Sequence, residues 1–461
     1  MPPKQPIDDD EHDYTNEPLP ALGNARHHRA NELEIRRIEI ELRDHFAKTR
    51  LWKYEKVLGS GFFGTAILVG NKTRRFNSNY RRLVVKRAIT DPGETELRNE
   101  INWLTRLRGA EHIVAIVASR DDAAVDPAAV APREPLFARL FRSGNSGQVR
   151  KSRDPRRIDD ELNLRGLAGY PVLVLEYLEN GTFARLIDRT TQHQTHLPNR
   201  LLWSIFLCLT RACVGMAYPM NREGGRRNLP EVFPAEGGPP GDLMHRYLHA
   251  GNVVFGDVDS TSQEHALIPI AKFIDFGAAF ESPEGTGPGF NIYDISILML
   301  AIITKTRTPN FNEQCIYRDI WTEATEILPE GNGANYPNLD DDLRWLLARC
   351  FAIDDQDRPT LQQLLTEVEN AVRTKTAGTF PFAQAPLETD AAIKTFLQNL
   401  VYNADVEANG ANALEVAPQD EHMGPPFRRL RQLVRRGWNR MEESLTQGLQ
   451  LDQSAHYFRL D

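Results

Sequence analysis

The sequence predicts an α+β fold, in which a small sheet with one inserted helix comes first and a larger helical part follows. Strand patterns occupy residues 54–70 and 81–89, and residues 94–109 have helical spacing. Long apolar helices then dominate from residue 197 to residue 372. Strands that are gathered before the helices, rather than alternating with them, are typical of the α+β class.

The N-terminal region divides into two segments. Residues 1–30 are rich in Pro, Asp and His and poor in large apolar side chains, so we expect a disordered tail there. Residues 31–53 are predicted to hold an amphipathic helix ahead of the first strand. The apolar side chains that recur there at roughly helical spacing are Leu33, Ile35, Ile38, Leu42 and Phe46.

An irregular stretch interrupts the pattern over residues 119–169. It begins with Ala, Asp and Pro and continues into the basic run "RSGNSGQVRKSRDPRR". A stretch of this length is too long for an ordinary connection within a compact domain. We therefore expect an exposed insertion over residues 119–169.

The remaining elements are mostly helical. Residues 169–187 combine a buried strand with the start of a helix, and residues 197–218 form a long apolar helix. Residues 291–304 and 341–372 also have helical patterns.

The C-terminal region, residues 373–461, is predicted to be a tail with amphipathic helices. An apolar stripe in this tail lies opposite a basic face, so it would either pack against the domain or dock on a protein partner or a membrane surface. The stripe consists of Phe427, Leu430, Val434, Trp438, Met441, Leu445 and Leu449.

Composition indicates a protein of the cell interior, cytoplasmic or nuclear. The net charge of -8 gives no electrostatic reason to expect nucleic-acid binding. There is no apolar signal segment, and no apolar run approaches the ~20 residues of a transmembrane segment. Four cysteines without CxxC spacing predict buried reduced thiols, rather than zinc ligands or disulfides, at Cys208, Cys213, Cys315 and Cys350.

A glycine-rich turn, "GSGFFG", joins the first two strand patterns. Gly59, Gly61 and Gly64 have the GxGxxG spacing that lets backbone amides approach phosphates. The turn lies between two strands rather than between a strand and a helix. This context favours a hairpin that covers phosphates over a dinucleotide-binding Rossmann turn.

Several further motifs follow in a fixed order. Lys86 lies in the strand pattern "LVVKRA", twenty-two residues after Gly64, and Glu100 follows fourteen residues later in a predicted helix. After them come "LEYLENG", "HRYLHAGN", "IDFG", "YDIS" and "CFAIDDQDRP". In this order the motifs resemble the protein kinase family over residues 54–372. The resemblance implies a two-lobed protein-kinase-like fold, with a small antiparallel sheet lobe and a larger helical lobe.

The resemblance also implies a site for ATP and Mg²⁺. Lys86 would contact the α- and β-phosphates, and a lysine buried there needs a carboxylate such as Glu100 to hold it. Asn252 and Asp275 supply oxygen atoms of the kind that Mg²⁺ prefers, so both would be metal ligands.

Other positions of the family pattern are assigned supporting roles. The backbone from Glu176 to Leu178 would meet the adenine edge, and Asp294 would hold the backbone of the catalytic loop. Ala66 and Val84 would line the nucleotide pocket. The family usually has these two residue types the other way round, which either preserves the pocket volume or reflects drift.

The catalytic loop departs from the family at two chemical positions. Tyr247 stands where the family has the aspartate that accepts the proton of the substrate hydroxyl, and His249 stands where a lysine contacts the transferred phosphate. A phenol with a pKa near ~10 is protonated at neutral pH and cannot act as a carboxylate base. Loss of a positioned base typically costs ~100- to 10,000-fold in rate.

We expect the first of three functions, and the other two remain as alternatives. The first is a pseudokinase that binds ATP with Mg²⁺ and acts as a regulatory or binding module, with a protein partner on the domain or on the C-terminal helix. The second is a divergent, active protein serine/threonine kinase. The third is a small-molecule kinase of the aminoglycoside or choline kinase type, whose loop "DLHxxN" is similar around His249.

The segment after Asp275 is short for the family. Asp294 follows only nineteen positions after Asp275, and there is no A-P-E triplet, so the usual peptide platform is not expected. Arg358, whose usual partner is the glutamate of that triplet, would pair with Glu281, with Glu284 or with another group.

Overall fold

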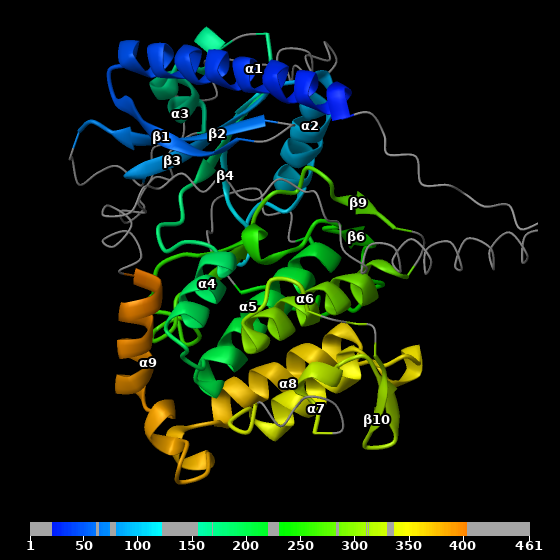
Figure 1. Ribbon diagram of the computed structural model, residues 1–461. Coiled ribbons are helices and arrows are strands. Elements are labelled where there is room, and N and C mark those ends of the chain that lie inside the picture. The colour runs from blue at the N-terminus through cyan, green and yellow to red at the C-terminus, as the bar shows by residue number, and fades with distance from the viewer. Residues whose placement is uncertain are drawn as a thin grey trace, which may run out of the picture.

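The computed structural model describes residues 21–402, apart from residues 61–63, 74–79, 122–154, 168, 220–229, 283–284, 310, 312 and 330–335. The stripe predicted between Phe427 and Leu449 therefore lies outside the described residues. Within them the protein is mixed α+β, with a small antiparallel sheet above a larger helical part (Figure 1). This arrangement is compatible with two lobes.

A five-stranded sheet forms the upper part, with the strand order β1-β2-β3-β5-β4. Each neighbouring pair is antiparallel. Its strands are β1 (Trp52–Ser60), β2 (Gly64–Asn71), β3 (Arg82–Ala88), β4 (Ile116–Arg120) and β5 (Val172–Glu176). The sequence patterns predicted β1, β2, β3 and β5, whereas β4 was not predicted.

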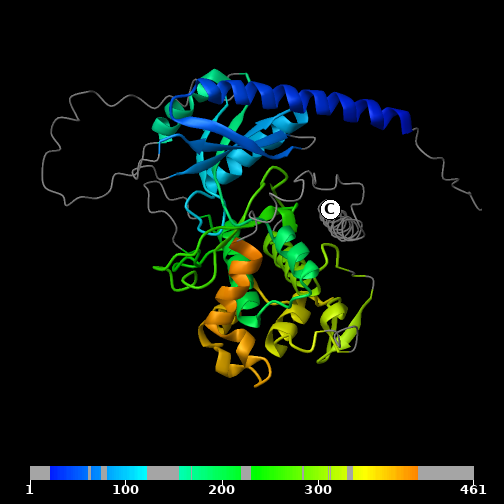
Figure 2. The ribbon, with the colours of Figure 1, turned by 60° about the vertical axis from the view of Figure 1, so that its left-hand side comes forward.

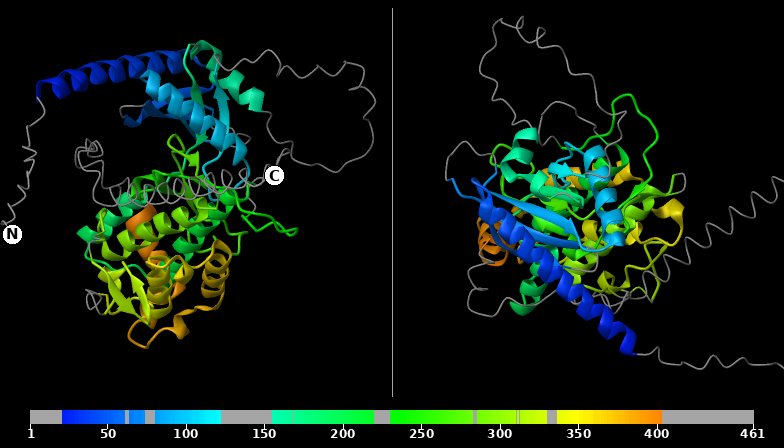
Figure 3. Two further views of the ribbon diagram at one scale, coloured as in Figure 1. Left: turned by 90° about the vertical axis from the view of Figure 1, so that its right-hand side faces the viewer. Right: turned by 90° about the horizontal axis from the view of Figure 1, so that it is seen from above.

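The helix α1 (Ala21–Lys48) lies across the outer face of this sheet, as seen from the side in Figure 2 and from above in Figure 3. Ile38, Leu42 and Phe46 are buried against the sheet in one cluster of apolar side chains. The helix begins ten residues earlier than the boundary predicted between tail and helix, and β1 begins at Trp52, within the predicted segment 31–53. The packing confirms the predicted stripe at Ile38, Leu42 and Phe46, with Ile35 partly buried beside them, whereas Leu33 is exposed and lies outside it.

The end of the predicted insertion is not exposed. The helix α3 (Pro155–Leu162) and the following 3₁₀ turn η4 (Leu164–Leu167) pack on the same outer face as α1. Their side chains Ile158, Leu162 and Leu167 are buried. The prediction of an exposed insertion over residues 119–169 is therefore wrong at both ends, since Ser119 and Arg120 also belong to β4.

The helix α2 (Asp91–Arg106) packs against β3, β4 and β5 of the sheet. It begins at a capped end: the hydroxyl of Thr90 accepts a hydrogen bond of 3.2 Å from the main-chain N–H of Gly93. Pro92 occupies the first turn, where its missing N–H costs nothing. This start places Glu100 in the middle of the helix, on the buried side.

Helices make up most of the lower part (Figure 1). The central helix α5 is buried along almost its whole length, and α6 and α8 pack against it. The helices are α4 (Phe183–Gln192), α5 (Asn199–Ala217), α6 (Gly287–Thr304), α7 (Asp341–Cys350), α8 (Leu361–Thr374) and α9 (Asp390–Leu397). Short turns of 3₁₀ or π type are η5 (Ala250–Asn252), η6 (Thr325–Ile327), η8 (Asp355–Asp357), η9 (Ala377–Thr379), η10 (Ala385–Glu388) and η11 (Gln398–Tyr402).

Two helices, α5 and α6, are long and apolar enough to cross a membrane by length and composition alone. In their most apolar windows, however, 94% and 61% of the residues are buried inside the protein. Core helices of soluble proteins meet the same criteria, so the absence of a transmembrane segment stays a prediction.

Three pairs of short strands complete the fold. They are β6 (Leu243–Met244) with β9 (Phe280–Glu281), β7 (Val253–Phe255) with β8 (Ala271–Phe273), and β10 (Cys315–Tyr317) with β11 (Ile320–Thr322). The first two pairs matter for function, because they carry the predicted catalytic loop and the segment around Asp275. None of the four cysteines forms a disulfide, as predicted; Cys208, Cys213 and Cys350 are buried, whereas Cys315 is only partly buried, contrary to the prediction.

Candidate functional site

Lys86 lies between two carboxylates. Its Nζ atom is 2.8 Å from Oε1 and 3.0 Å from Oε2 of Glu100, and it is also 2.8 Å from Oδ1 of Asp275. The Glu100 side chain is 3% exposed, whereas the Asp275 side chain is 42% exposed. The predicted contact between Lys86 and Glu100 is confirmed, and the fold brings Asp275 to the same ammonium group from 189 residues away.

The charges in this cluster follow from burial and from the shared lysine. Burial alone would lower the pKa of Lys86, but the carboxylates of Asp275 and Glu100 raise it, so the ammonium group stays charged. Lys86 in turn lowers the pKa of Asp275, with smaller effects from His245 and His249. Burial raises the pKa of Glu100 to about 7, against the opposing effect of Lys86. Asp275, the more exposed of the two carboxylates, therefore has the lower pKa, and the buried Glu100 has the higher one.

The alternation of β3 explains why Lys86 points to this cluster. Leu83 and Val85 are fully buried on the outer face, under α1, whereas Val84 and Lys86 alternate with them and face the helical part. Ala66 of β2 is the direct cross-strand partner of Lys86. Ala66 and Val84 are therefore on the face predicted for the nucleotide.

The two described glycines of the turn have different surroundings. A Cβ atom on Gly64 would come within 2.8 Å of the main-chain oxygen of Arg87, so the close approach of β3 requires glycine there. A Cβ atom on Gly59 would meet nothing within 4 Å. Gly61 lies outside the described residues. Gly64 has a purely structural reason to be glycine, whereas Gly59 has open space beside it.

Glu176 is the last residue of β5 and anchors the connection between the two parts. Its Oε1 atom accepts hydrogen bonds from the main-chain N–H of Ala115, at 2.9 Å, and from Nζ of the buried Lys272, at 2.8 Å. Leu178 follows two residues later, and its Cδ2 atom lies 3.4 Å from the position of a Cβ atom on Gly256. The carboxylate of Glu176 is therefore used inside the protein, and its main-chain N–H also donates to the oxygen of Ala115, at 3.1 Å. Neither group remains for the predicted contact with adenine.

The predicted catalytic loop is held together by its own hydrogen bonds. The side-chain Nδ2 of Asn252 donates to the main-chain oxygen of Tyr247 (2.9 Å), and the main-chain N–H of Asn252 donates to the oxygen of His249 (2.8 Å). The rings of Tyr247 and His249 meet edge to face, with their centroids 4.7 Å apart. Nδ1 of His249 accepts a hydrogen bond of 3.0 Å from the N–H of Gly251.

Asn252 and Asp275 are brought close by the pairing of β7 with β8. The main-chain N–H of Ile274, next to Asp275, donates to the main-chain oxygen of Asn252 (3.0 Å). Asp275 has a φ of 68°, and Arg246 in the loop has a φ of 66°. Left-handed backbone at residues other than glycine is strained and is often found at functional sites.

These oxygen atoms suit a magnesium ion. Nδ2 of Asn252 already donates a hydrogen bond to Tyr247, so the side-chain amide oxygen is the atom that could bind an ion. Asp275 is ionised and partly exposed. Carboxylate and amide oxygens are ligands that Mg²⁺ prefers, so the chemistry of the donor set fits the ion.

The backbone of the loop is fixed by Asn291 rather than by Asp294. Oδ1 of Asn291 accepts from the N–H of His245 (3.3 Å), and its Nδ2 donates to the oxygen of Leu243 (2.7 Å). Asp294 has no hydrogen bond to any described residue, and burial raises its pKa to about 7. The role predicted for Asp294 therefore belongs to Asn291, three residues earlier on α6 and on a neighbouring part of the same face.

Residues of α2 hold the segment after Asp275. Nδ2 of Asn99 donates to the main-chain oxygens of Gly277 and Ala279, both at 2.8 Å. The indole N–H of Trp103 donates to Ala279 as well, at 3.0 Å. These residues escaped prediction because their partners are some 180 residues away in the chain. The only sequence feature that pointed to Asn99 and Trp103 is their position close to Glu100 on the same predicted helix.

The segment then continues directly into α6. Phe280 and Glu281 pair with β6, and α6 begins at Gly287. Glu281 forms an ion pair with Arg106 (3.0 Å), not with Arg358. Arg358 bonds to the oxygen of Ala352 and to Asp355 instead, both within its own loop.

None of the aspartates near Tyr247 is oriented as a replacement base. Asp242 accepts from Ser282 and Gly287 and so fixes the start of α6. Asp259 caps its own turn, with Oδ1 2.8 Å from the N–H of Thr261. Asp257 lies 3.3 Å from Nδ2 of Asn180.

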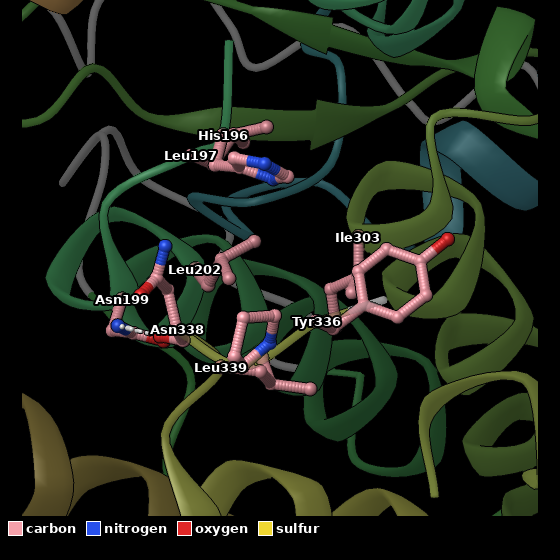
Figure 4. Close-up of a pocket in the computed structure, with 9 residues that line it drawn as sticks. His196, Leu197, Asn199, Leu202, Ile303, Tyr336, Asn338 and Leu339 are labelled. Carbon is pink, nitrogen blue, oxygen red and sulfur yellow. Dashed lines mark hydrogen bonds between the residues drawn. The ribbon is translucent and has the colours of Figure 1, made fainter. Parts of the chain in front are cut away.

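A separate small cavity lies in the helical part (Figure 4). With a volume of about 30 Å³ it has room for water but not for a nucleotide. Its wall includes the hydrogen bond between Asn199 and Asn338. None of the predicted site residues lines it. The lining residues are His196, Leu197, Asn199, Leu202, Ile303, Tyr336, Pro337, Asn338 and Leu339.

No protein-family model matches this chain, and no curated protein matches it either.

Proposed function

We propose that residues 54–372 form a protein-kinase-like domain that binds ATP with Mg²⁺ and transfers phosphate slowly or not at all. The observation that carries this proposal is the cluster of Lys86, Glu100 and Asp275, set beside a loop in which Tyr247 stands at the position of the base. A domain of this kind acts as a regulatory or binding module.

The charge of the cluster supports nucleotide binding. Lys86 is a fixed positive charge on the inner face of the sheet, and it faces an aspartate that is partly open to solvent. Anionic phosphates would meet this ammonium group, and Asn252 and Asp275 would hold the Mg²⁺ ion that neutralises the remaining phosphate charge. The ion's chemical contribution would be this neutralisation.

The contacts of Tyr247 and its neighbours support a weak phosphotransferase. The phenol cannot accept a proton at neutral pH, and the flanking aspartates already serve turns and the start of α6. His249 is a neutral or singly charged ring rather than a flexible lysine, and its Nδ1 is engaged by Gly251. Phosphoryl transfer then depends on positioning alone.

The short segment after Asp275 favours one rival function over the other. Only residues 276–286 separate Asp275 from α6, and β9 ties this segment to β6. This length supports a small acceptor, as in the small-molecule kinases, better than an extended peptide acceptor. An activity assay therefore has to offer both kinds of acceptor.

Nucleotide binding is tested by thermal unfolding of the full chain with ATP, with and without Mg²⁺. Ligand at ~100 times its dissociation constant adds about 2.7 kcal/mol to the free energy of unfolding. We expect Mg²⁺ to enlarge the ATP-induced rise in melting temperature, and Lys86→Met to abolish most of it.

The matched control is Lys53→Ala, which removes an exposed lysine from β1, the edge strand of the same sheet. Because β2 lies between β1 and the strand β3 that carries Lys86, this variant should keep the full shift. A wild-type melting temperature that does not move in millimolar ATP and Mg²⁺ would contradict the proposal.

A further inference from the structure

Three buried side chains from distant parts of the chain meet away from the Lys86 cluster. They are His112, in the connection between α2 and β4, Cys208 on α5, and His265, between β7 and β8. Their exposed fractions are 0%, 1% and 3%. One nitrogen or sulfur atom from each lies within 4.8 Å of the others.

The separation of the two imidazoles matches a shared metal ion. Their Nε2 atoms face each other at 3.1 Å. Two nitrogen ligands that each lie ~2.0–2.1 Å from a tetrahedral zinc ion would be about 3.3 Å apart. A thiolate and two imidazoles are also the ligand types that zinc selects, whereas Mg²⁺ and Ca²⁺ prefer oxygen.

Glu231 orients His112 in the way that metal-binding histidines are commonly oriented. Its Oε2 atom is 2.6 Å from Nδ1 of His112, and its Oε1 atom accepts from the main-chain N–H of the same residue at 2.8 Å. The carboxylate thus fixes the ring and leaves Nε2 facing Nε2 of His265. A carboxylate hydrogen-bonded to the second nitrogen is the usual outer partner of a histidine ligand.

The buried charges also balance. A divalent ion bound to the thiolate of Cys208, with the carboxylate of Glu231 one ring away, gives a local net charge of zero. Burying charge without compensation would cost several kcal/mol. Arg211, beside this group, is already paired with Glu264 and Glu369.

We propose that His112, Cys208 and His265 bind one zinc ion that fastens the connection after α2 and the loop between β7 and β8 to the central helix α5. Water would take the fourth position of a tetrahedral ion. Binding releases the thiol proton of Cys208 and the proton shared between the two imidazoles. This proposal departs from the sequence-based expectation for Cys208, because its partners lie far away in the chain.

Without an ion, the same atoms form a hydrogen-bonded pair. Burial alone would lower the pKa of His112, but Glu231 and Cys208 raise it to about 10, so the ring would be an imidazolium that donates to His265. The two states differ in metal content, in the protonation of Cys208 and in spectroscopy. They can therefore be separated without an activity assay.

The first experiment measures zinc in the full chain after expression with added zinc and removal of loosely bound metal. We expect about one zinc ion per chain, and a loss of ten-fold or more in Cys208→Ala, in line with the loss of a ligand. Cys213→Ala is the matched control, because Cys213 is equally buried on the same helix but lies outside the cluster. It should keep its zinc.

The second experiment uses only the wild-type chain, so its result does not depend on whether a variant folds. Cobalt(II) is titrated into the wild-type chain after the zinc has been removed with a chelator. A tetrahedral site with one thiolate should give the visible bands and the sulfur-to-cobalt charge-transfer absorption of such sites, and zinc should abolish both. A folded wild-type chain that contains no zinc and gives no cobalt spectrum would overturn the proposal and leave the His112–Glu231 ion pair. Equal zinc content in Cys208→Ala and the wild type would overturn it too.

Discussion

The side-chain amide of Asn252 donates a hydrogen bond of 2.9 Å to the main-chain oxygen of Tyr247. The predicted metal ligand and the residue at the position of the base are thus joined through the backbone of Tyr247, not through its ring. A substitution at Tyr247 can therefore change the chemistry of the loop while its hydrogen bonding is preserved.

On this basis, Tyr247→Asp should restore a carboxylate without disturbing Asn252. We expect phosphate transfer from ATP to rise by about 100-fold or more, equivalent to about 3 kcal/mol of activation free energy. The measurement is transfer of labelled phosphate to a set of peptides and to a set of amino sugars and choline-like compounds.

Tyr247→Phe controls for this substitution, since it removes the hydroxyl but adds no base, and it should leave the rate unchanged. If the wild type is already as active as Tyr247→Asp, the phenol is not the defect. If ATP hydrolysis rises without transfer to any acceptor, the loss lies in acceptor binding.

The two described glycines of the turn should respond differently to alanine. Gly64→Ala places a Cβ atom 2.8 Å from the oxygen of Arg87, so the backbone must shift, at a cost of about 1–3 kcal/mol in stability. Gly59→Ala meets nothing within 4 Å and should change stability by less than about 0.5 kcal/mol. Urea unfolding of both variants checks this difference, and equal losses would show that the packing around Gly64 is not what requires glycine.

Asn291→Ala should destabilise the loop that carries Tyr247. The substitution leaves the N–H of His245 and the oxygen of Leu243 buried without their partner, at a cost of about 1–3 kcal/mol. The variant should also show faster hydrogen exchange at residues 243–252. A loss of stability in Asp294→Asn as large as in Asn291→Ala would restore the role predicted for Asp294.

The pH dependence of stability should report on Asp294. Burial raises its pKa to about 7, above the ~3.9 of an unfolded chain, so the folded state binds more protons between these values. Stability is therefore lost as pH rises through this window, and Asp294→Asn removes that loss. We expect the variant to be more stable than the wild type by roughly 1–2 kcal/mol at pH 8 and nearly equal to it at pH 4. Thermal melts at both values test this, and an equal difference at the two would contradict it.

The elements with long, regular patterns could be predicted from the sequence. The apolar runs of α5 and α6 and the alternation around Lys86 each reflect burial against a single core, which leaves a local signature. The strand β4 was missed because its short apolar run ends where the irregular stretch begins. The helix α3 was missed because a basic run precedes its first buried residue, Ile158.

The contacts of the site could be predicted only in part. The pairing of Lys86 with Glu100 follows from the order of motifs, but the choice of Asn291 over Asp294 depends on how α6 is rotated against the loop. Residues three positions apart on a helix share a face, so spacing alone could not distinguish them. The meeting of His112 with Cys208 and His265 depends on the whole chain path and has no local signature.

Because α1 covers the outer face of the sheet, the chain cannot be shortened to the start of β1 without exposing that face. A fragment that began at Tyr54, where the family resemblance begins, would lack Ile38, Leu42 and Phe46 and would open the outer face of the sheet to water. Each of these side chains contributes about 1.5–3 kcal/mol by burial, so together they match a large share of the 5–15 kcal/mol that typically separates a folded domain from its unfolded chain. The smallest autonomous folding unit therefore extends upstream of the glycine-rich turn, and α1 belongs to it as much as any strand.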